Sequence, residues 1–192
     1  MLSVVATSAI AEEQISEGGR SPDGAYEVRI ERQATKGQEP VEYGIYVQSV
    51  NPQKRIFTLP EIGGYLGYGA AIERDHSYWH GSSRFVAITD QRTRHSRELY
   101  VVAIADGKPT VIPQPDFYQN ALGRVNAVEI DFSSVVTPQK WDGDDLILQL
   151  HLTANHRRGY TFEVVLNLTH EKYVAPHMSL KSVKLLKEDA VG

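Results

Sequence analysis

The sequence predicts a mostly β fold, in which antiparallel meanders form a sandwich or a partial propeller-like sheet assembly with at most one or two short helices. Three observations predict it. Apolar and polar residues alternate along several segments, which is the period of a half-buried strand. Two short segments are continuously apolar, as in central strands covered on both faces. Two further alternating segments flank a polar turn, as in a hairpin.

The first part of the chain predicts a meander of three strands followed by the centre of the sheet. Alternation runs through residues 26–31 and again through 41–47, and a shorter apolar strand follows at 56–59. The continuously apolar segments are 85–88 and 99–104. We therefore expect the central strands there, with both faces covered.

A tight turn and a short helix are predicted next. Gly107 favours a turn because glycine adopts positive φ, and residues 110–112 then form a hairpin partner. Asp116 is a suitable N-cap for a short helix that carries Phe117 and ends at Gly123.

The last third of the chain is again strand-like. Residues 128–132 alternate as an amphipathic strand, and residues 146–152 and 160–168 form the clearest hairpin in the sequence. The segment 178–186 fits either a last strand or a helix, because its leucines and valine also match a period near 3.6.

We expect a single β domain at residues 12–188 and a loose C-terminus at 189–192. Residues 1–11 are apolar or small and end in Ala9-Ile10-Ala11, which resembles the rear half of a signal peptide. The positively charged leading region is missing, so this segment is either a signal-peptide remnant or a disordered N-terminus. The first interpretation predicts a periplasmic or secreted protein.

Composition and motifs argue against several functions. The net charge of -4 disfavours nucleic-acid binding, for which domains are usually basic. The sequence has no run of about 18 apolar residues for a transmembrane segment, and no Cys to act as a thiol nucleophile. The glycine-rich segment 63–69 lacks the Lys and the spacing of nucleotide-binding loops, so we expect no cofactor.

A polar turn precedes a strand three times along the chain. The turns are Ser21–Tyr26, Trp79–Phe85 and Trp141–Leu146, and the strands that follow them begin 59 and 61 residues apart. Repeats of this kind are typical of blade-like units.

The first two turns, at Ser21–Gly24 and Trp79–Ile88, resemble the blade repeats of TolB-like β-propellers, in which a Trp/Ser-Pro-Asp-Gly turn enters a strand. The second turn departs from this pattern at Gly81 and Ser82, where Pro and Asp are expected. Three units are also fewer than the four blades of the smallest common propellers. The resemblance therefore implies a related meander, and no partner or activity.

Several histidines and acidic residues are candidate metal ligands. Asp75, His76 and His80 are the first candidates, since His-x-x-x-His places two ligands on one face of a helix. No helix is predicted there, so we expect no metal site and interpret the segment as a loop against the end of a sheet. Residues 142–145 contain three Asp but lack the other oxygens of a calcium loop, and are interpreted as a turn.

One candidate surface for partner binding is aromatic. Tyr65 and Tyr68 lie in the glycine-rich segment, and with Trp79 they offer large rings for recognition. The alternative is that these tyrosines simply cover the core.

A second candidate surface is basic. Arg94 and Arg97 lie in one predicted hairpin loop, and Arg157 and Arg158 lie in another. If both loops emerge at one end of the sheet, they form an anion-binding patch. The alternative is scattered, solubilising charge.

These observations favour a non-enzymatic, exported binding or interaction module for an unknown ligand, with a protein or a glycan as its partner. The first alternative is a hydrolase or lyase with a metal site or an acid and base from distant strands, for which Asp75, His76 and His80 are the first candidates. The second alternative is a structural envelope protein.

Overall fold

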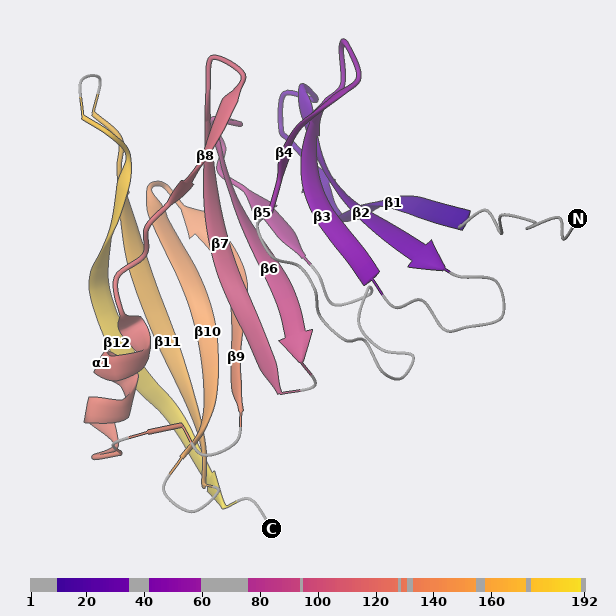
Figure 1. The fold of residues 1–192 in the computed structure, drawn as a ribbon. Helices are drawn as coiled ribbons and strands as arrows, with labels where there is room; N and C mark the ends of the chain where they lie inside the picture. The colour runs from indigo at the N-terminus through magenta and orange to yellow at the C-terminus, as the bar shows by residue number, and fades with distance from the viewer. Residues whose placement is uncertain are drawn as a thin grey trace, which may run out of the picture.

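The computed structural model describes residues 10–34, 42–59, 76–93, 95–127, 129–130, 133–154, 158–171 and 174–190. These residues contain twelve strands and one helix, which confirms the predicted mostly β class (Figure 1). The helix among the described residues is too short to cross a lipid bilayer. In chain order the elements are β1 (Ile10–Arg20), β2 (Tyr26–Ala34), β3 (Glu42–Ser49), β4 (Lys54–Thr58), β5 (Ser77–Trp79), β6 (Phe85–Thr93), β7 (Ser96–Ala105), β8 (Lys108–Ile112), α1 (Phe117–Arg124), β9 (Ser134–Asp142), β10 (Asp145–Ala154), β11 (Arg158–Thr169) and β12 (His177–Ala190).

The strands form three consecutive antiparallel meanders of four strands each. The first, β1 to β4, is a separate sheet in chain order. The second, β5 to β8, and the third, β9 to β12, are joined into one eight-stranded sheet by a pairing of β7 with β9. This junction is parallel and pairs Ser96 and Arg97 of β7 with Ser134 and Val135 of β9. In Figure 1 the meanders follow one another across the molecule, from β1–β4 to β9–β12.

The central strands β6 and β7 contribute to two hydrophobic cores. Val86 and Val102 belong to a smaller core shared with β2, β3 and the end of β4. Phe85 and Val101, on the opposite face, belong to a larger core shared with α1 and the strands β9 to β12. Successive residues of a strand point to opposite faces, so an uninterrupted apolar run serves both cores. The prediction that these two strands are covered on both faces is confirmed.

The predicted helix is α1, but its end differs from the prediction. Asp116 caps it as expected, because its carboxylate accepts a hydrogen bond from the Gln119 N–H at 3.0 Å. The helix continues through Gly123 to Arg124, and the Val125 N–H closes it on the Leu122 carbonyl.

The predicted strand at 128–132 is wrong for its described part, because residues 129 and 130 are not in a strand. Asn126, with a positive φ of 53°, turns the chain out of α1. Ile130 then packs against the larger core from a loop, and strand β9 begins only at Ser134.

The first two repeated turns share the same backbone hydrogen bonds. In the first, the Gly24 N–H donates to the Ser21 carbonyl at 2.9 Å, and in the second the Ser83 N–H donates to the His80 carbonyl at 2.9 Å. Gly24 and Ser83 both have positive φ, at 70° and 60°. The third turn is tighter and places Gly143 at a φ of 59° between β9 and β10.

Two tryptophans tie each later meander to the one before it. The Trp79 indole N–H donates to the Gly19 carbonyl of β1 at 3.0 Å, and the Trp141 indole N–H donates to the Tyr78 carbonyl of β5 at 2.9 Å. Gly19 lies two residues before Ser21 and Tyr78 lies two residues before His80, and Ser21 and His80 are the carbonyl acceptors of the first two repeated turns. The two bonds are therefore equivalent, and the repeat extends beyond the turns to the contacts between meanders.

Candidate functional site

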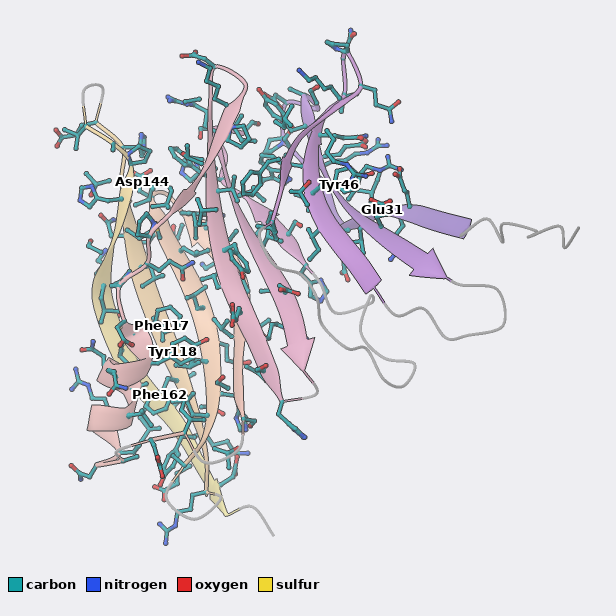
Figure 2. All side chains as sticks on the ribbon, in the orientation of Figure 1. Glu31, Tyr46, Phe117, Tyr118, Asp144 and Phe162 are labelled. Atoms are coloured by element: carbon teal, nitrogen blue, oxygen red, sulfur yellow. The ribbon has the colours of Figure 1, made fainter. Side chains whose placement is uncertain are left out.

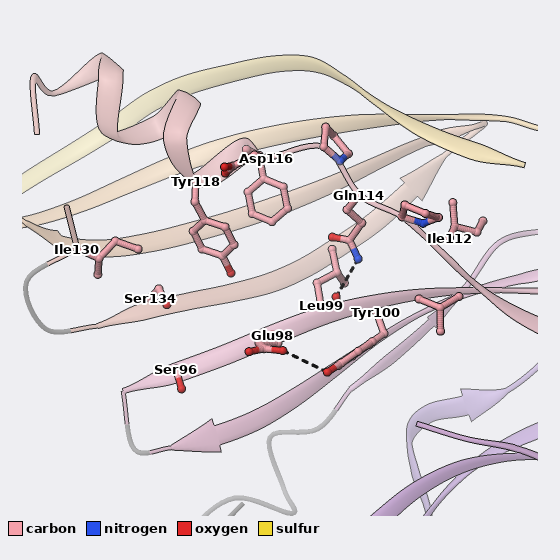
Figure 3. Close-up of a pocket in the computed structure, with 14 residues that line it drawn as sticks. Ser96, Glu98, Leu99, Tyr100, Ile112, Gln114, Asp116, Tyr118, Ile130 and Ser134 are labelled. Atoms are coloured by element: carbon pink, nitrogen blue, oxygen red, sulfur yellow. Dashed lines mark hydrogen bonds between the residues drawn. The ribbon is translucent and has the colours of Figure 1, made fainter. Parts of the chain in front are cut away.

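The middle of β7 lies between two different partner strands on one edge. β8 pairs with residues 101–105 of β7, and β9 pairs with Ser96 and Arg97. Glu98 to Tyr100 fall between these two pairings in the described sheet. A hollow of about 530 Å³ lies here, between β7, the segment after β8, the start of α1 and the start of β9 (Figure 3).

Two prolines direct the chain around this hollow. Pro113 follows β8 and cannot extend its ladder, because proline has no N–H. Pro115 favours an extended conformation for Gln114, whose side-chain amide donates to the Leu99 carbonyl of β7 at 2.8 Å. This bond satisfies a backbone acceptor in the interrupted stretch of β7. Asp116 then caps α1, so that the first turn of the helix lies beside the hollow.

The floor of the hollow is apolar and buried. Leu99, Ile112 and Phe117 line it and are 8%, 2% and 3% exposed. The rings of Phe117 and Tyr118 stack with their centroids 4.6 Å apart, and Tyr100 supplies a third ring. Apolar walls around a volume of this size suit a small organic molecule.

Polar groups also line the hollow. The Tyr100 hydroxyl donates a hydrogen bond to the Glu98 carboxylate at 3.1 Å (Figure 3). The Tyr118 hydroxyl points from α1 toward the strands that carry Glu98 and Ser134 (Figure 3). Burial raises the pKa of Tyr118 to about 12, and the negative charges of Glu98 and Asp116 act in the same direction. Of the described residues around the hollow none is Lys, Arg or His, so its ionisable lining is acidic.

Two residues predicted for partner binding also contact neighbouring strands. Trp79 is half-buried and stacks on Tyr26 with ring centroids 6.2 Å apart, besides its bond to β1. Arg97 is only 8% exposed, and its guanidinium donates to the Thr137 hydroxyl of β9 at 3.2 Å. These contacts occupy much of the Trp79 and Arg97 side chains.

The two predicted basic loops emerge at the same end of the sheet, because Ser134 of β9 pairs with both Ser96 and Leu152. Arg158 is exposed and forms an ion pair with Glu188 at 2.9 Å, which raises the pKa of the Arg158 guanidinium. The pair lies at a second hollow of about 610 Å³. The other predicted surface residues, Tyr65, Tyr68, Arg94 and Arg157, lie outside the described residues.

The histidines of the predicted metal candidates lie at opposite ends of a strand. His76 and His80 flank β5, and residues four apart in a strand are separated by about 13 Å. They are too far apart to bind one ion, and His76 instead contacts the Glu17 carboxylate at 3.1 Å. Asp75 lies outside the described residues. In the described part of the chain no group of three or more His, Asp or Glu side chains is arranged to hold a metal ion.

Sequence analysis missed a cluster at the second and third repeated turns. The Asp144 carboxylate lies 3.3 Å from the His80 Nε2 and 2.9 Å from the His170 Nε2. The His80 Nδ1 accepts a hydrogen bond from the Ser82 N–H at 3.2 Å and lies 2.8 Å from the Ser82 hydroxyl. The proton of a neutral His80 is therefore on Nε2 and faces Asp144.

This cluster is separate from the hollow, because none of its residues lines the hollow, and Figure 2 shows Asp144 away from Tyr118. Its one signal in the sequence is the repeat, which brings equivalent turns of neighbouring meanders together. The first and second turns meet in a similar way, where the Asp23 N–H donates to the Ser83 hydroxyl at 3.1 Å.

Comparisons of the chain with protein-family models, with curated proteins and with solved structures gave no match.

Proposed function

We propose that the protein is a non-enzymatic binding module, and that its ligand is a small organic molecule held in the hollow beside β7 and α1. The observation that supports this proposal most directly is that the polar side chains of Glu98, Tyr100 and Tyr118 line the same hollow as buried apolar residues. An apolar floor buries the body of a ligand, while a few fixed polar groups orient it. The phenols add rigid contact area at a small cost in conformational entropy.

A cavity-filling variant tests this proposal. Ser134→Phe adds a ring beside Tyr118, whereas Ser182→Phe makes the same change at an exposed position of β12. We expect a mixed panel of small aromatic compounds, observed by ligand-detected NMR, to contain members that bind the wild-type protein and the Ser182→Phe variant. The same members should lose binding to Ser134→Phe. Equal binding to both folded variants would place the ligand elsewhere.

A hydrolase is the second candidate, and one specific observation favours it. Ser82, His80 and Asp144 form a hydrogen-bonded series in the order of a nucleophile, a base and an orienting carboxylate. The first repeated turn gives a structural explanation for the same geometry, because the Asp23 carboxylate accepts from the Ser21 hydroxyl at 2.7 Å. Ser82 lies 59 residues after Asp23, and His80 lies 59 residues after Ser21. The contact between Ser82 and His80 is therefore equivalent to the contact between Asp23 and Ser21.

A serine-directed fluorophosphonate probe decides between these interpretations. A nucleophilic Ser82 is labelled, and the label is lost in Ser82→Ala while it persists in the exposed control variant Ser179→Ala. We expect no labelling of Ser82, since we interpret it as part of a structural turn. Labelling that disappears only in Ser82→Ala would favour the hydrolase.

We also propose that the protein is exported and that its meanders are related to propeller blades. Ala9-Ile10-Ala11 supports export, and the equivalent turns and tryptophan bonds support the blade relationship. Strand β1 begins at Ile10, so cleavage after Ala11 would leave most of it. Mass spectrometry of the protein from an expressing bacterium should then find a periplasmic form that starts at Glu12. A protein found only in the cytoplasm would contradict export.

A further inference from the structure

We propose that the ligand of the hollow carries one secondary amide on an apolar body, and that this amide takes the place of the Gln114 side chain at the edge of β7. This inference rests on the proposed function and adds the chemical class of the ligand. It follows from the direction of the Leu99 backbone and from the group that occupies that edge.

Leu99 directs its backbone groups to the edge of β7 that carries β8 and β9. Alternate residues of a strand direct their N–H and C=O groups to the same edge. The Ser134 N–H of β9 donates to the His95 carbonyl at 2.8 Å, so the odd-numbered residues face this edge. Along it, Arg97 pairs with β9 and Val101 pairs with β8. The opening between the two partner strands is therefore one outward-facing residue long, at Leu99.

The side chain of Gln114 occupies this opening as a substitute for a backbone amide. Its Nε2 donates to the Leu99 carbonyl at 2.8 Å, as the N–H of a partner strand would (Figure 3). Gln114 is half-buried and lines the hollow, so this hydrogen bond lies beside the volume that the ligand fills. The amide of a glutamine and the amide of a ligand share the donor and the acceptor that the edge of a sheet recognises.

The length of the opening limits the ligand to a single amide. An extended peptide adds to a sheet edge through several residues, but here β8 and β9 occupy the positions on either side of Leu99. One amide offers a donor for the Leu99 carbonyl and an acceptor for the Leu99 N–H, which points to the same edge. The apolar remainder of the ligand then contacts the buried side chains of Ile112 and Phe117, which line the same hollow.

Three matched neutral compounds test the amide. N-benzylacetamide has the amide N–H, benzylacetone has a methylene in its place, and N-benzyl-N-methylacetamide has a methyl group in place of the hydrogen. We expect the wild-type protein to bind N-benzylacetamide at least about fivefold more tightly than either of the others, because one hydrogen bond is gained. Without that bond the amide would bind more weakly than the ketone, since its desolvation costs more.

Gln114→Ala tests the position, and Gln119→Ala is its matched control. Gln119 is exposed on α1, and only its backbone N–H takes part in the helix cap. Without the Gln114 amide the Leu99 carbonyl is left to the ligand. We therefore expect the preference for N-benzylacetamide over benzylacetone to rise at least about threefold in Gln114→Ala and to stay unchanged in Gln119→Ala. If Gln114→Ala does not fold, the order of the three compounds in the wild-type protein decides the question.

The outcomes separate this inference from the proposed function. Equal or tighter binding of benzylacetone, lost in Ser134→Phe, would overturn the amide preference and leave the hollow as a ligand site. Failure of all three compounds to bind, while another panel member is lost in Ser134→Phe, would do the same. An unchanged preference in folded Gln114→Ala would also overturn the inference. Binding of none of the three, with no panel member sensitive to Ser134→Phe, would overturn both proposals.

Discussion

At Tyr118, burial and two neighbouring carboxylates act in the same direction and raise the pKa of the phenol to about 12 from its ordinary value of 10.0. The group is protonated in both the folded and the unfolded chain below pH 10. As the pH rises from about 10 to about 12, the unfolded chain releases this proton first, so stability falls over that interval. The hollow therefore contributes to the alkaline limit of the fold.

We predict that this loss of stability at alkaline pH is caused by the phenol of Tyr118. Between about pH 9 and about pH 11.5, the free energy of unfolding of the wild-type protein should fall by about 2 kcal/mol more than that of Tyr118→Phe. Urea unfolding at the two pH values measures both. An equal fall in the two proteins would mean that Tyr118 titrates normally.

The single residues of the hollow were only partly accessible to sequence reasoning. Asp116 and Phe117 were predicted as the cap and the first apolar residue of a helix, and both positions are confirmed. Glu98, Tyr100 and Tyr118 were not singled out, because nothing in their local sequence shows that they converge. Their meeting depends on where β9 joins β7, which is a long-range contact.

Among the elements, β1 meets β5 at a close backbone approach. Gly18 has a φ of 67°, and a Cβ added to it would lie 2.3 Å from the carbonyl oxygen of Ser77. A side chain at this position would force the two strands apart. The irregularity in the pairing of β1 with β2 falls between Ile15 and Arg20, around the same glycine.

We predict that Gly18→Ala destabilises the junction of the first and second meanders. The substitution should lower the free energy of unfolding by about 3 kcal/mol, since positive φ and a steric clash add together. Gly81→Ala is the control, because nothing lies within 4 Å of its added Cβ, and it should change stability by less than about 0.5 kcal/mol. Similar effects of the two changes in urea unfolding would contradict the close approach.

Strands β1 and β9 were not predicted from the sequence, because each has a weak strand pattern. β1 has only two large apolar residues, Ile10 and Ile15, and its conformation depends on pairing with β2. β9 contains Pro138, which normally argues against a strand and here lies beside an irregularity in the pairing with β10.

The ambiguity of β12 has a similar cause. Ser182 pairs with Val165, but Leu180 pairs with the next residue, Leu166, so Lys181 is an extra residue on β12. A second such irregularity follows at Leu186. Each extra residue lengthens the spacing between inward side chains from two to three. The sequence therefore imitates a helical period, although the segment is a strand.

At the scale of the whole molecule, β6 and β7 couple the two cores. Ile45 belongs to the smaller core and Leu150 to the larger one, and both are 0% exposed. Neither core is complete without the central strands. The alternation and the apolar runs made the β class predictable, whereas the number of meanders and the interrupted edge of β7 depend on pairings far apart in sequence.

We predict that the protein unfolds in one cooperative transition, and that a substitution in either core lowers the stability of the whole protein. Ile45→Ala and Leu150→Ala should each lower the free energy of unfolding by about 2 to 5 kcal/mol. Calorimetry should show a single transition, shifted to lower temperature in both variants. A second transition that one substitution leaves in place would show that the meanders unfold separately.

The claim on which the functional account depends is that the hollow beside β7 and α1 receives a ligand. Amide chemical-shift mapping during titrations with the compounds of the aromatic panel tests it most directly. We predict shifts concentrated at residues 96–100 and 111–118 and at Ile130 and Ser134. Shifts gathered instead around His80, Asp144 and His170, or no shifts with any compound at saturation, would contradict it.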